Sequence, residues 1–243
     1  MLLAIDIGNT NINFGIFKRR KLIQRFFIPT KSYRIKKLKN VLVKYDVTEG
    51  IVCSVVPFAT KIVARDLKKL LGKQPYIIGK QIKVPLKNLY RKPKQVGQDR
   101  LVNAYAAVKF FAAPLIVVDF GTAITFDVVG KNKAYLGGMI LPGLEISLEA
   151  LAQRTALLPK IKLARPREFI GRDTKNSMLS GIVYGLAALT DDFVERIKAQ
   201  VGENAKVVAT GGNVKLIGQY CKRIDKIDRD LTLKGLKMLR DLK

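Results

Sequence analysis

The chain has 243 residues, 48% hydrophobic and 26% charged, which is enough for one large domain or two smaller ones with a full core. It contains no histidine, and this excludes Ser-His-Asp and Cys-His catalysis as well as histidine-ligated metals. The two cysteines, Cys53 and Cys221, lack partners at metal-ligand spacing and indicate neither zinc nor a disulfide framework.

The charge balance is strongly basic, with 45 Lys and Arg against 19 Asp and Glu. Such a chain attracts phosphates, in nucleotides, nucleic acids or acidic membranes. The basic residues are scattered, however, and no nucleic-acid-binding motif appears among them, so we favour a Lys-rich solvated surface over nucleic acid as a partner. No apolar run approaches the ~20 residues that span a bilayer, and the MLLAID start does not resemble a signal peptide. We expect a cytoplasmic protein that has no membrane partner.

The first half of the chain predicts a mixed α/β unit. A β-hairpin at 2–17 precedes a strand at 21–29, a helix at 31–45, a strand at 50–56, a helix at 57–71 and a short strand at 75–78. Pro57 suits the first turn of its helix, and Gly72 suits the end. Residues 79–99 read as an extended basic connection, and a helix follows at 101–111.

The second half repeats the opening pattern. A hairpin at 115–127 precedes a strand at 133–141, a helix at 144–153, a basic linker, a long helix at 174–201, a strand at 205–209 and a helix at 230–242. Asp119 in this hairpin follows Asp6 in the first one by 113 positions, which suggests a duplicated unit. We therefore expect two lobes, 1–112 and 113–243.

The two hairpin tips have the composition of an anion site. Small residues let backbone N–H groups point at an anion, and a carboxylate just before them can hold a cation bound to that anion. Asp6 with Asn9 and Thr10, and Asp119 with Thr122, would form two jaws around a polyphosphate and its cation. One copy alone favours an ordinary hairpin turn. Two copies at equivalent places favour the binding site.

Two further segments are candidates. In Gly97–Gln98–Asp99–Arg100, the carboxylate could be a general base whose neighbour grips an anionic substrate. Taken alone, the same residues favour a helix N-cap and a surface arginine. Thr210–Gly211–Gly212 is a third place where backbone can approach a flat ligand, although strand-to-helix turns commonly carry glycine.

Taken in order, the motifs of the whole chain, 1–243, resemble those of type III pantothenate kinases, in the superfamily of actin, hexokinase and Hsp70-like ATPases. The matching segments are DIGNT at 6–10, Tyr90 with Pro93, VGQDR at 96–100, DFGTAIT at 119–125, GG at 137–138, LPG at 141–143, GRDT at 171–174, TGG at 210–212 and DLT at 230–232. Single motifs are generic to the superfamily, but the full ordered set is specific.

The resemblance implies an α/β fold with two RNase-H-like (actin-like ATPase) lobes, mixed sheets flanked by helices, and an ATP cleft between them. It implies ATP-dependent phosphorylation of pantothenate to 4'-phosphopantothenate, the first step of coenzyme A biosynthesis. It also implies a homodimer in which the partner subunit completes the pantothenate pocket.

The resemblance further assigns roles by matching position. Asp99 would be the catalytic base, Asp119 would help bind a monovalent cation (K⁺ or NH₄⁺), and Thr122 would contact ATP. The pantothenate pocket would be lined by Tyr90, Gly97, Gln98, Asp99, Arg100 and Thr174. The first phosphate loop, with Asp6 toward Mg²⁺, would comprise Asp6, Ile7, Gly8, Asn9, Thr10, Asn11, Ile12 and Asn13.

The chain departs from the family pattern at two pocket positions. Lys92 stands where Asn or Asp is usual, and Gln98 where Ala is common. Two other functions are compatible with the same fold: a nucleic-acid-binding accessory factor for gene expression, and a different phosphotransferase such as a sugar kinase or polyphosphate hydrolase. The intact set of Asp6, Asp99, Arg100 and Asp119 favours the pantothenate kinase.

Overall fold

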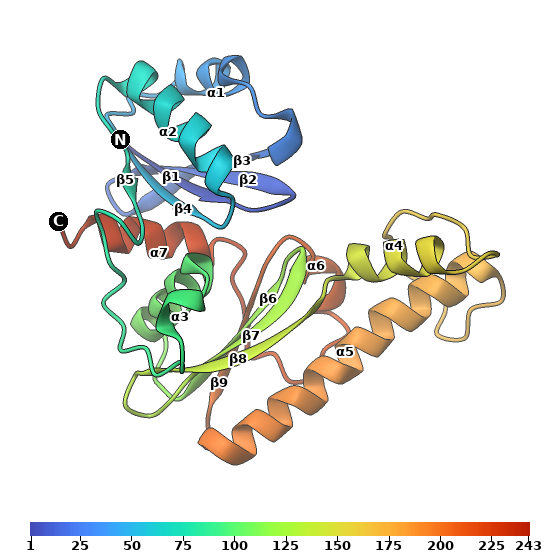
Figure 1. The fold of residues 1–243 in the computed structure, drawn as a ribbon. Coiled ribbons are helices and arrows are strands. Elements are labelled where there is room, and N and C mark those ends of the chain that lie inside the picture. The colour runs from blue at the N-terminus through green and yellow to red at the C-terminus, as the bar shows by residue number, and fades with distance from the viewer. The chain divides into compact units, whose positions relative to one another are not determined.

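The computed structural model describes residues 1–243 and divides into two compact units, each built on one sheet (Figure 1). Unit 1 comprises Met1–Leu86, Arg91–Ala106 and Asp230–Lys243; unit 2 comprises Lys87–Tyr90 and Ala107–Arg229. The expected lobes 1–112 and 113–243 differ from these units chiefly at Asp230–Lys243. This segment groups with unit 1 because its leucines are buried against the first sheet.

The sheet of unit 1 has the strand order β3-β2-β1-β4-β5. Strands β1 (Leu2–Ile7), β2 (Asn11–Lys18) and β3 (Lys21–Pro29) form an antiparallel meander. Strands β4 (Glu49–Ser54) and β5 (Tyr76–Ile77) extend it in parallel from β1. Most of β1 and β4 is buried, since helices cover both faces of the sheet.

Helices cover the two faces of this sheet from different parts of the chain (Figure 1). On one face lie α1 (Ile35–Leu42) and α2 (Pro57–Leu71), whose Leu38 and Val63 pack with Ile5 of β1. On the other face lie the first turns of α3 (Gln98–Phe110) and α7 (Leu231–Arg240). Two 3₁₀ turns, η1 (Thr30–Ser32) and η2 (Pro93–Gln95), lie in the connections.

The sheet of unit 2 repeats this topology, with the order β10-β9-β6-β7-β8. Strands β6 (Leu115–Phe120), β7 (Ala123–Val129) and β8 (Tyr135–Pro142) form the antiparallel meander, and β9 (Lys206–Thr210) and β10 (Lys226–Ile227) add in parallel. Position for position, β6 to β10 correspond to β1 to β5. The repeated hairpin in the sequence is thus one part of a repeated five-stranded sheet.

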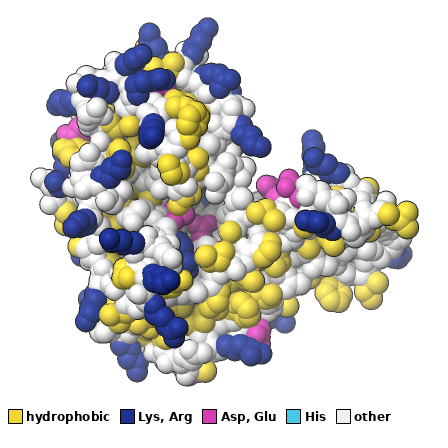
Figure 2. Space-filling model, in the orientation of Figure 1, with side chains coloured by type: hydrophobic (Ala, Val, Ile, Leu, Met, Phe, Trp, Pro, Cys, Tyr) yellow, Lys and Arg dark blue, Asp and Glu magenta, His cyan; other side chains and the backbone are white.

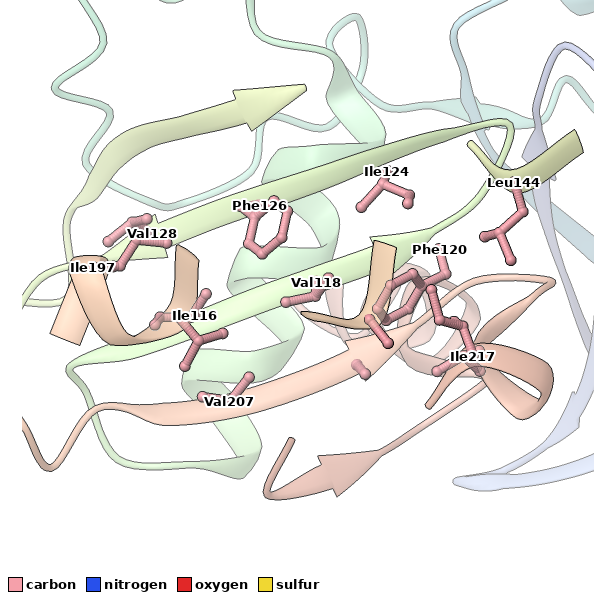
Figure 3. Close-up of a cluster of buried hydrophobic side chains, with 14 of the residues drawn as sticks. Ile116, Val118, Phe120, Ile124, Phe126, Val128, Leu144, Ile197, Val207 and Ile217 are labelled. Atoms are coloured by element: carbon pink, nitrogen blue, oxygen red, sulfur yellow. The ribbon is translucent and has the colours of Figure 1, made fainter. Parts of the chain in front are cut away.

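One face of the second sheet carries the largest hydrophobic cluster of unit 2 (Figure 3). Alternate residues of β6 and β7 point into it, as their period of two requires. Helices α4 (Leu144–Arg154), α5 (Thr174–Val201) and α6 (Val214–Ile217) close it from the other side. Members labelled in Figure 3 are Ile116, Val118, Phe120, Ile124, Phe126, Val128, Leu144, Ile197, Val207 and Ile217.

The expected elements are present, and their type is correct throughout. The helix expected at 31–45 is shorter, because Arg34 is extended (φ −145°, ψ 139°) and α1 begins only at Ile35. Helix α3 begins three residues before the expected 101, so Gln98 and Asp99 belong to its first turn. The short α6 and β10 were not expected, since four and two residues are too few to show a period. No helix combines the length and apolar character needed to cross a bilayer.

Candidate active site

The first candidate loop connects β1 and β2 in unit 1. Asp6 lies between two neighbouring strands, opposite Asn13 of β2 and Cys53 of β4, and the Nδ2 of Asn13 donates to its Oδ2 at 3.3 Å. The turn is closed by the N–H of Gly8, which donates to the carbonyl of Asn11 at 3.0 Å. Gly8 has little room for a side chain, because a Cβ there would lie 3.1 Å from that carbonyl oxygen.

A residue outside the loop holds this turn in place. The hydroxyl of Thr30 donates to the carbonyl of Gly8 at 2.7 Å, and its N–H donates to the carbonyl of Thr10 at 2.9 Å. Asn9 and Thr10 at the tip remain exposed. The predicted phosphate loop is therefore a fixed turn with a carboxylate at its base and exposed polar groups at its tip.

The second candidate segment, Gly97–Arg100, opens α3 in the same unit. The Oδ1 of Asp99 accepts a hydrogen bond from the N–H of Arg100 at 2.8 Å. A Cβ at Gly97 would collide with this carboxylate oxygen, so glycine is required there for Asp99 to keep its position. Arg100 is 8% exposed, which sets it apart from an ordinary surface arginine.

The side chain of Gln98 contacts a different part of unit 1 from Asp99 and Arg100. It packs over Gly79, where a Cβ would lie 3.1 Å from its Cδ, and Gly79 has the left-handed backbone (φ +83°) that favours glycine. The side chain of Gln98 thus supports the loop after β5. What Gln98 offers to a ligand is therefore chiefly its backbone.

Unit 1 brings two of the predicted carboxylates within electrostatic range. Burial, followed by the negative charge of Asp99, raises the pKa of Asp6 from 3.8 to about 7, and the hydrogen bond from Asn13 opposes the shift. Burial also raises the pKa of Asp99, against the N–H and the charge of Arg100. Two acids that resist ionising in the same place are typical of a site that receives a cation or a proton.

Cys53 is a neighbour of these acids that sequence reasoning did not identify. It is fully buried opposite Asp6 on β4, and burial, with the charges of Asp6 and Asp99, raises the pKa of its thiol well above the ordinary value. It remains a protonated thiol there and adds no charge to the site. Its only sequence signal was its place in an apolar strand.

The second hairpin tip, in unit 2, joins three segments of the chain. Gly211 follows β9 with a left-handed backbone (φ +99°), and a Cβ there would collide with the Oδ1 of Asp119 and the backbone of Phe120. A Cβ at Gly143 would collide with the carbonyl of Thr122. The tip of β6 and β7, the start of α4 and the turn after β9 therefore meet with backbone against backbone.

This arrangement assigns a role to glycines that the sequence left as weak candidates. Gly143 and Gly211 hold Thr122 and Asp119 in place from neighbouring segments, while Gly212 has open space around its Cβ position. Thr122 is exposed and Asp119 half-buried, so both can reach a ligand. No group of three or more His, Cys, Asp or Glu side chains could hold a metal ion. Single carboxylates suit cations that are held together with phosphate oxygens.

Two predicted substrate-pocket residues also belong to unit 2. Tyr90 is half-buried, its ring lies against Gly137, and its centroid is 6.5 Å from that of Tyr135. Thr174 is exposed in the first turn of α5. The helix start is capped by Asp173, whose carboxylate accepts from the N–H of Asn176 at 2.8 Å.

A surface groove of about 410 Å³ in unit 2 contains none of the predicted residues. It is lined by Arg165, Pro166, Arg167, Tyr184 and Tyr220. On the face drawn in Figure 2, Lys and Arg side chains are spread over the surface instead of forming one patch. The basic balance of the sequence is thus not concentrated at a single site on this face.

Comparison with known proteins agrees with the motifs. A family model described as type III pantothenate kinase matches residues 2–196. The type III pantothenate kinase of Finegoldia magna is 44% identical over 256 residues, covering 100% of this chain and 97% of the relative. That of Halalkalibacterium halodurans is 41% identical over 249 residues, covering 98% of both.

Solved structures resemble the fold at lower identity. A candidate Baf family transcriptional activator from Campylobacter jejuni has a TM-score of 0.60 at 20% identity, covering 99% of this chain and 98% of the other. A candidate 2-dehydro-3-deoxygalactonokinase from Sinorhizobium meliloti has a TM-score of 0.56 at 12% identity, covering 100% and 99%. These likenesses confirm the expected α/β fold of sugar kinases and actin-like ATPases and carry no more than the fold. The family model and the full-length relatives show that the chain belongs to the type III pantothenate kinase family of enzymes.

Proposed function

We propose that this protein transfers the γ-phosphoryl group of ATP to the primary hydroxyl of pantothenate, which yields 4'-phosphopantothenate for coenzyme A biosynthesis. The observation that carries the proposal is the Asp6–Asp99 pair in unit 1, where two acids with raised pKa values lie beside a glycine-containing loop. It occurs in a member of the type III pantothenate kinase family. Phosphoryl transfer needs mainly alignment and charge neutralisation, and the absent histidine is no obstacle.

Asp99 is the proposed catalytic base. A carboxylate whose pKa is raised by burial accepts a proton more readily than an exposed one. Its Oδ1 is held by the N–H of Arg100, which leaves Oδ2 to orient the pantothenate hydroxyl. Arg100, almost buried, would grip the pantothenate carboxylate, as guanidinium groups do.

Asp6 is the proposed Mg²⁺-side residue of the phosphate loop. Mg²⁺ bound with ATP supplies positive charge against the developing charge of the phosphoryl group. With a pKa of about 7, the Asp6 carboxyl is near half-protonated at neutral pH, and a nearby cation favours its ionised form. The exposed Asn9 and Thr10, with the rest of the loop to Asn13, would face the phosphates.

Asp119 and Thr122 form the corresponding part of unit 2. Thr122 would contact ATP, and Asp119 would help bind K⁺ or NH₄⁺. The support is the close fit of Gly211, beside which the Asp119 Oδ1 and the Phe120 carbonyl oxygen both lie, and of Gly143 against the carbonyl of Thr122. K⁺ prefers such oxygen donors, including carbonyls, to a cluster of acids.

Tyr90 and Thr174 are the proposed unit 2 residues of the pantothenate pocket, in a homodimer whose second copy completes that pocket. Exposed apolar side chains in the connection between α4 and α5 support self-association, because a single chain leaves them uncovered. Leu157 is 91% exposed, Phe169 69% and Ile170 77%.

The test is release of ADP from ATP and Mg²⁺ with and without pantothenate. We expect pantothenate-dependent release that is greater in K⁺ than in Na⁺, and no release with sugars in place of pantothenate. Asp99→Asn should lower kcat by about 10²–10⁴-fold, the usual contribution of a general base. A variant that stays as active as the wild type would refute the role of Asp99. Absence of pantothenate-dependent release would refute the proposed reaction.

A further inference from the structure

One face of the second sheet carries a row of polar side chains. Since Val118, Phe120, Ile124 and Phe126 point into the hydrophobic cluster (Figure 3), the alternating residues of β6 and β7 point to the opposite face. Asp119, Thr125 and Asp127 share that face. Asp119 and Thr125 stand directly opposite each other on the paired strands, so their Cβ atoms lie within about 5.5 Å.

Asp127 is the buried member of this row. It is 0% exposed, its Oδ1 accepts a hydrogen bond from the Tyr135 hydroxyl at 2.8 Å, and its Oδ2 accepts one from the Thr125 hydroxyl at 3.2 Å. Burying a carboxylate is costly even when it is bonded, and a sheet needs no acid at this position. The carboxylate fixes the orientation of the Thr125 hydroxyl, because it accepts the only hydrogen of that group.

The repeated topology supplies an internal comparison. In unit 1 the position that corresponds to Thr125 is Asn13, which stands opposite Asp6 as Thr125 stands opposite Asp119. Asn13 donates a hydrogen bond to Asp6, at 3.3 Å. Thr125 donates to Asp127 instead, so its oxygen keeps lone pairs on the face that it shares with Asp119. A carboxylate beside an oxygen with lone pairs offers a cation two neighbouring side chains as oxygen donors, whereas a carboxylate beside an N–H offers only its own oxygens.

We propose that Asp127 is a positioning residue for the monovalent cation: it orients the Thr125 hydroxyl so that its oxygen, and not its hydrogen, is offered on the Asp119 side. Thr125 is then a second oxygen donor for the cation. The inference rests on the proposed function, which assigns the cation to Asp119. It gives a role to two residues: Thr125, which stands in the DFGTAIT motif without an assigned role, and Asp127, which lies outside every matching motif.

Four variants separate the cation role from a structural one. Thr125→Val removes the oxygen and keeps the shape. Asp127→Asn lets an amide N–H donate to Thr125, which frees the hydroxyl hydrogen to turn toward Asp119. Tyr135→Phe is the matched control, since it removes the other hydrogen bond to Asp127 and leaves Thr125 untouched. Thr125→Ser restores the hydroxyl.

The measurement is the K⁺ concentration at half effect, in thermal unfolding and in calorimetric ATP binding, at constant ionic strength with tetramethylammonium as the replacement ion. We expect Thr125→Val and Asp127→Asn to raise it by about 10–100-fold, the usual effect of removing support around a metal site. Tyr135→Phe and Thr125→Ser should leave it near the wild-type value, even where Tyr135→Phe lowers stability.

The possible results distinguish a failure of this inference from a failure of the cation assignment. If the wild type responds to K⁺ and Thr125→Val responds at the same concentration, the inference is wrong while the cation assignment stands. If Tyr135→Phe shifts the K⁺ response as much as Thr125→Val, the effect is general loosening of the sheet, and the inference is also wrong. If the wild type shows no difference between K⁺ and tetramethylammonium, the cation assignment itself fails, and the inference with it.

Discussion

Replacing Asp6 with asparagine should make the ligand-free protein more stable at neutral pH while it removes a residue of the proposed site. Burial and Asp99 raise the pKa of Asp6 to about 7 in the folded state, against 3.8 in the unfolded chain. The folded state therefore binds the proton of Asp6 more tightly than the unfolded chain does. The stabilisation that this proton contributes is fully present below pH 3.8 and is lost as the pH rises through 7. Between pH 5 and pH 7.5 the wild type should lose about 2.5 kcal/mol of unfolding free energy. This is an upper value, because the half-buried carboxylate is partly screened by water.

The chain is well suited to this measurement because it has no histidine. Few other groups titrate between pH 5 and pH 7.5. Urea unfolding followed by far-UV circular dichroism, in buffer with a chelator and no nucleotide, should show the wild type weakening with pH and Asp6→Asn holding nearly constant. Asp99→Asn should show an intermediate slope, since it removes the charge that repels Asp6 but leaves Asp6 buried.

Parallel pH slopes for the wild type and Asp6→Asn would refute the reasoning. They would mean that the Asp6 carboxyl titrates at its ordinary pKa in the folded protein. In that case neither burial nor Asp99 acts on it, and the electrostatic argument for a cation at this loop fails.

Two further predictions concern backbone geometry. Gly211→Ala should strongly lower the affinity for ATP, because the new Cβ collides with Asp119 and the left-handed backbone becomes strained. Gly212→Ala is the control: its Cβ has open space, and the variant should bind ATP as the wild type does. Equal ATP affinity in both variants would contradict the packing described. Asp173→Ala should lower the unfolding free energy at neutral pH through loss of the helix cap, with a smaller effect below the lowered pKa of Asp173. A loss that is unchanged in acid would contradict the capping role.

The sequence predicted the fold well where a periodic hydrophobic pattern continued over many residues. The 28 residues of α5 and the alternating strands of both hairpins have the expected bounds or nearly so, because each repeats its pattern several times. Bounds at α1 and α3 were less accurate, since Arg34 and Gln98 carry no strong helix signal in either direction. The grouping of α7 with unit 1 could not be derived from local pattern, because it depends on which sheet face its leucines meet.

The sequence predicted the charged residues of the candidate site, but it did not predict the residues that hold them in place. Asp6 and Asp99 stand in recognisable motifs, but nothing in the sequence shows that the charge of Asp99 raises the pKa of Asp6, because the effect needs their spatial relation. Gly143 and Gly211 looked like ordinary turn glycines until their contacts with Thr122 and Asp119 were known. Asp127 gives no signal in the sequence, because an acid in a strand usually faces water.

The return of α7 to the first sheet has a consequence for synthesis on the ribosome. One face of that sheet, including Leu2, Ala4 and Cys53, is completed only when Leu233, Leu236 and Leu239 have been made. Unit 2 already has all of its residues by position 229. The order of folding can therefore reverse the order of the units in the chain: unit 2 can fold first, while the sheet that carries the proposed phosphate loop at Asp6 is completed only by nearly the last segment of the sequence. A ribosome-stalling series should show protease resistance in unit 2 before unit 1.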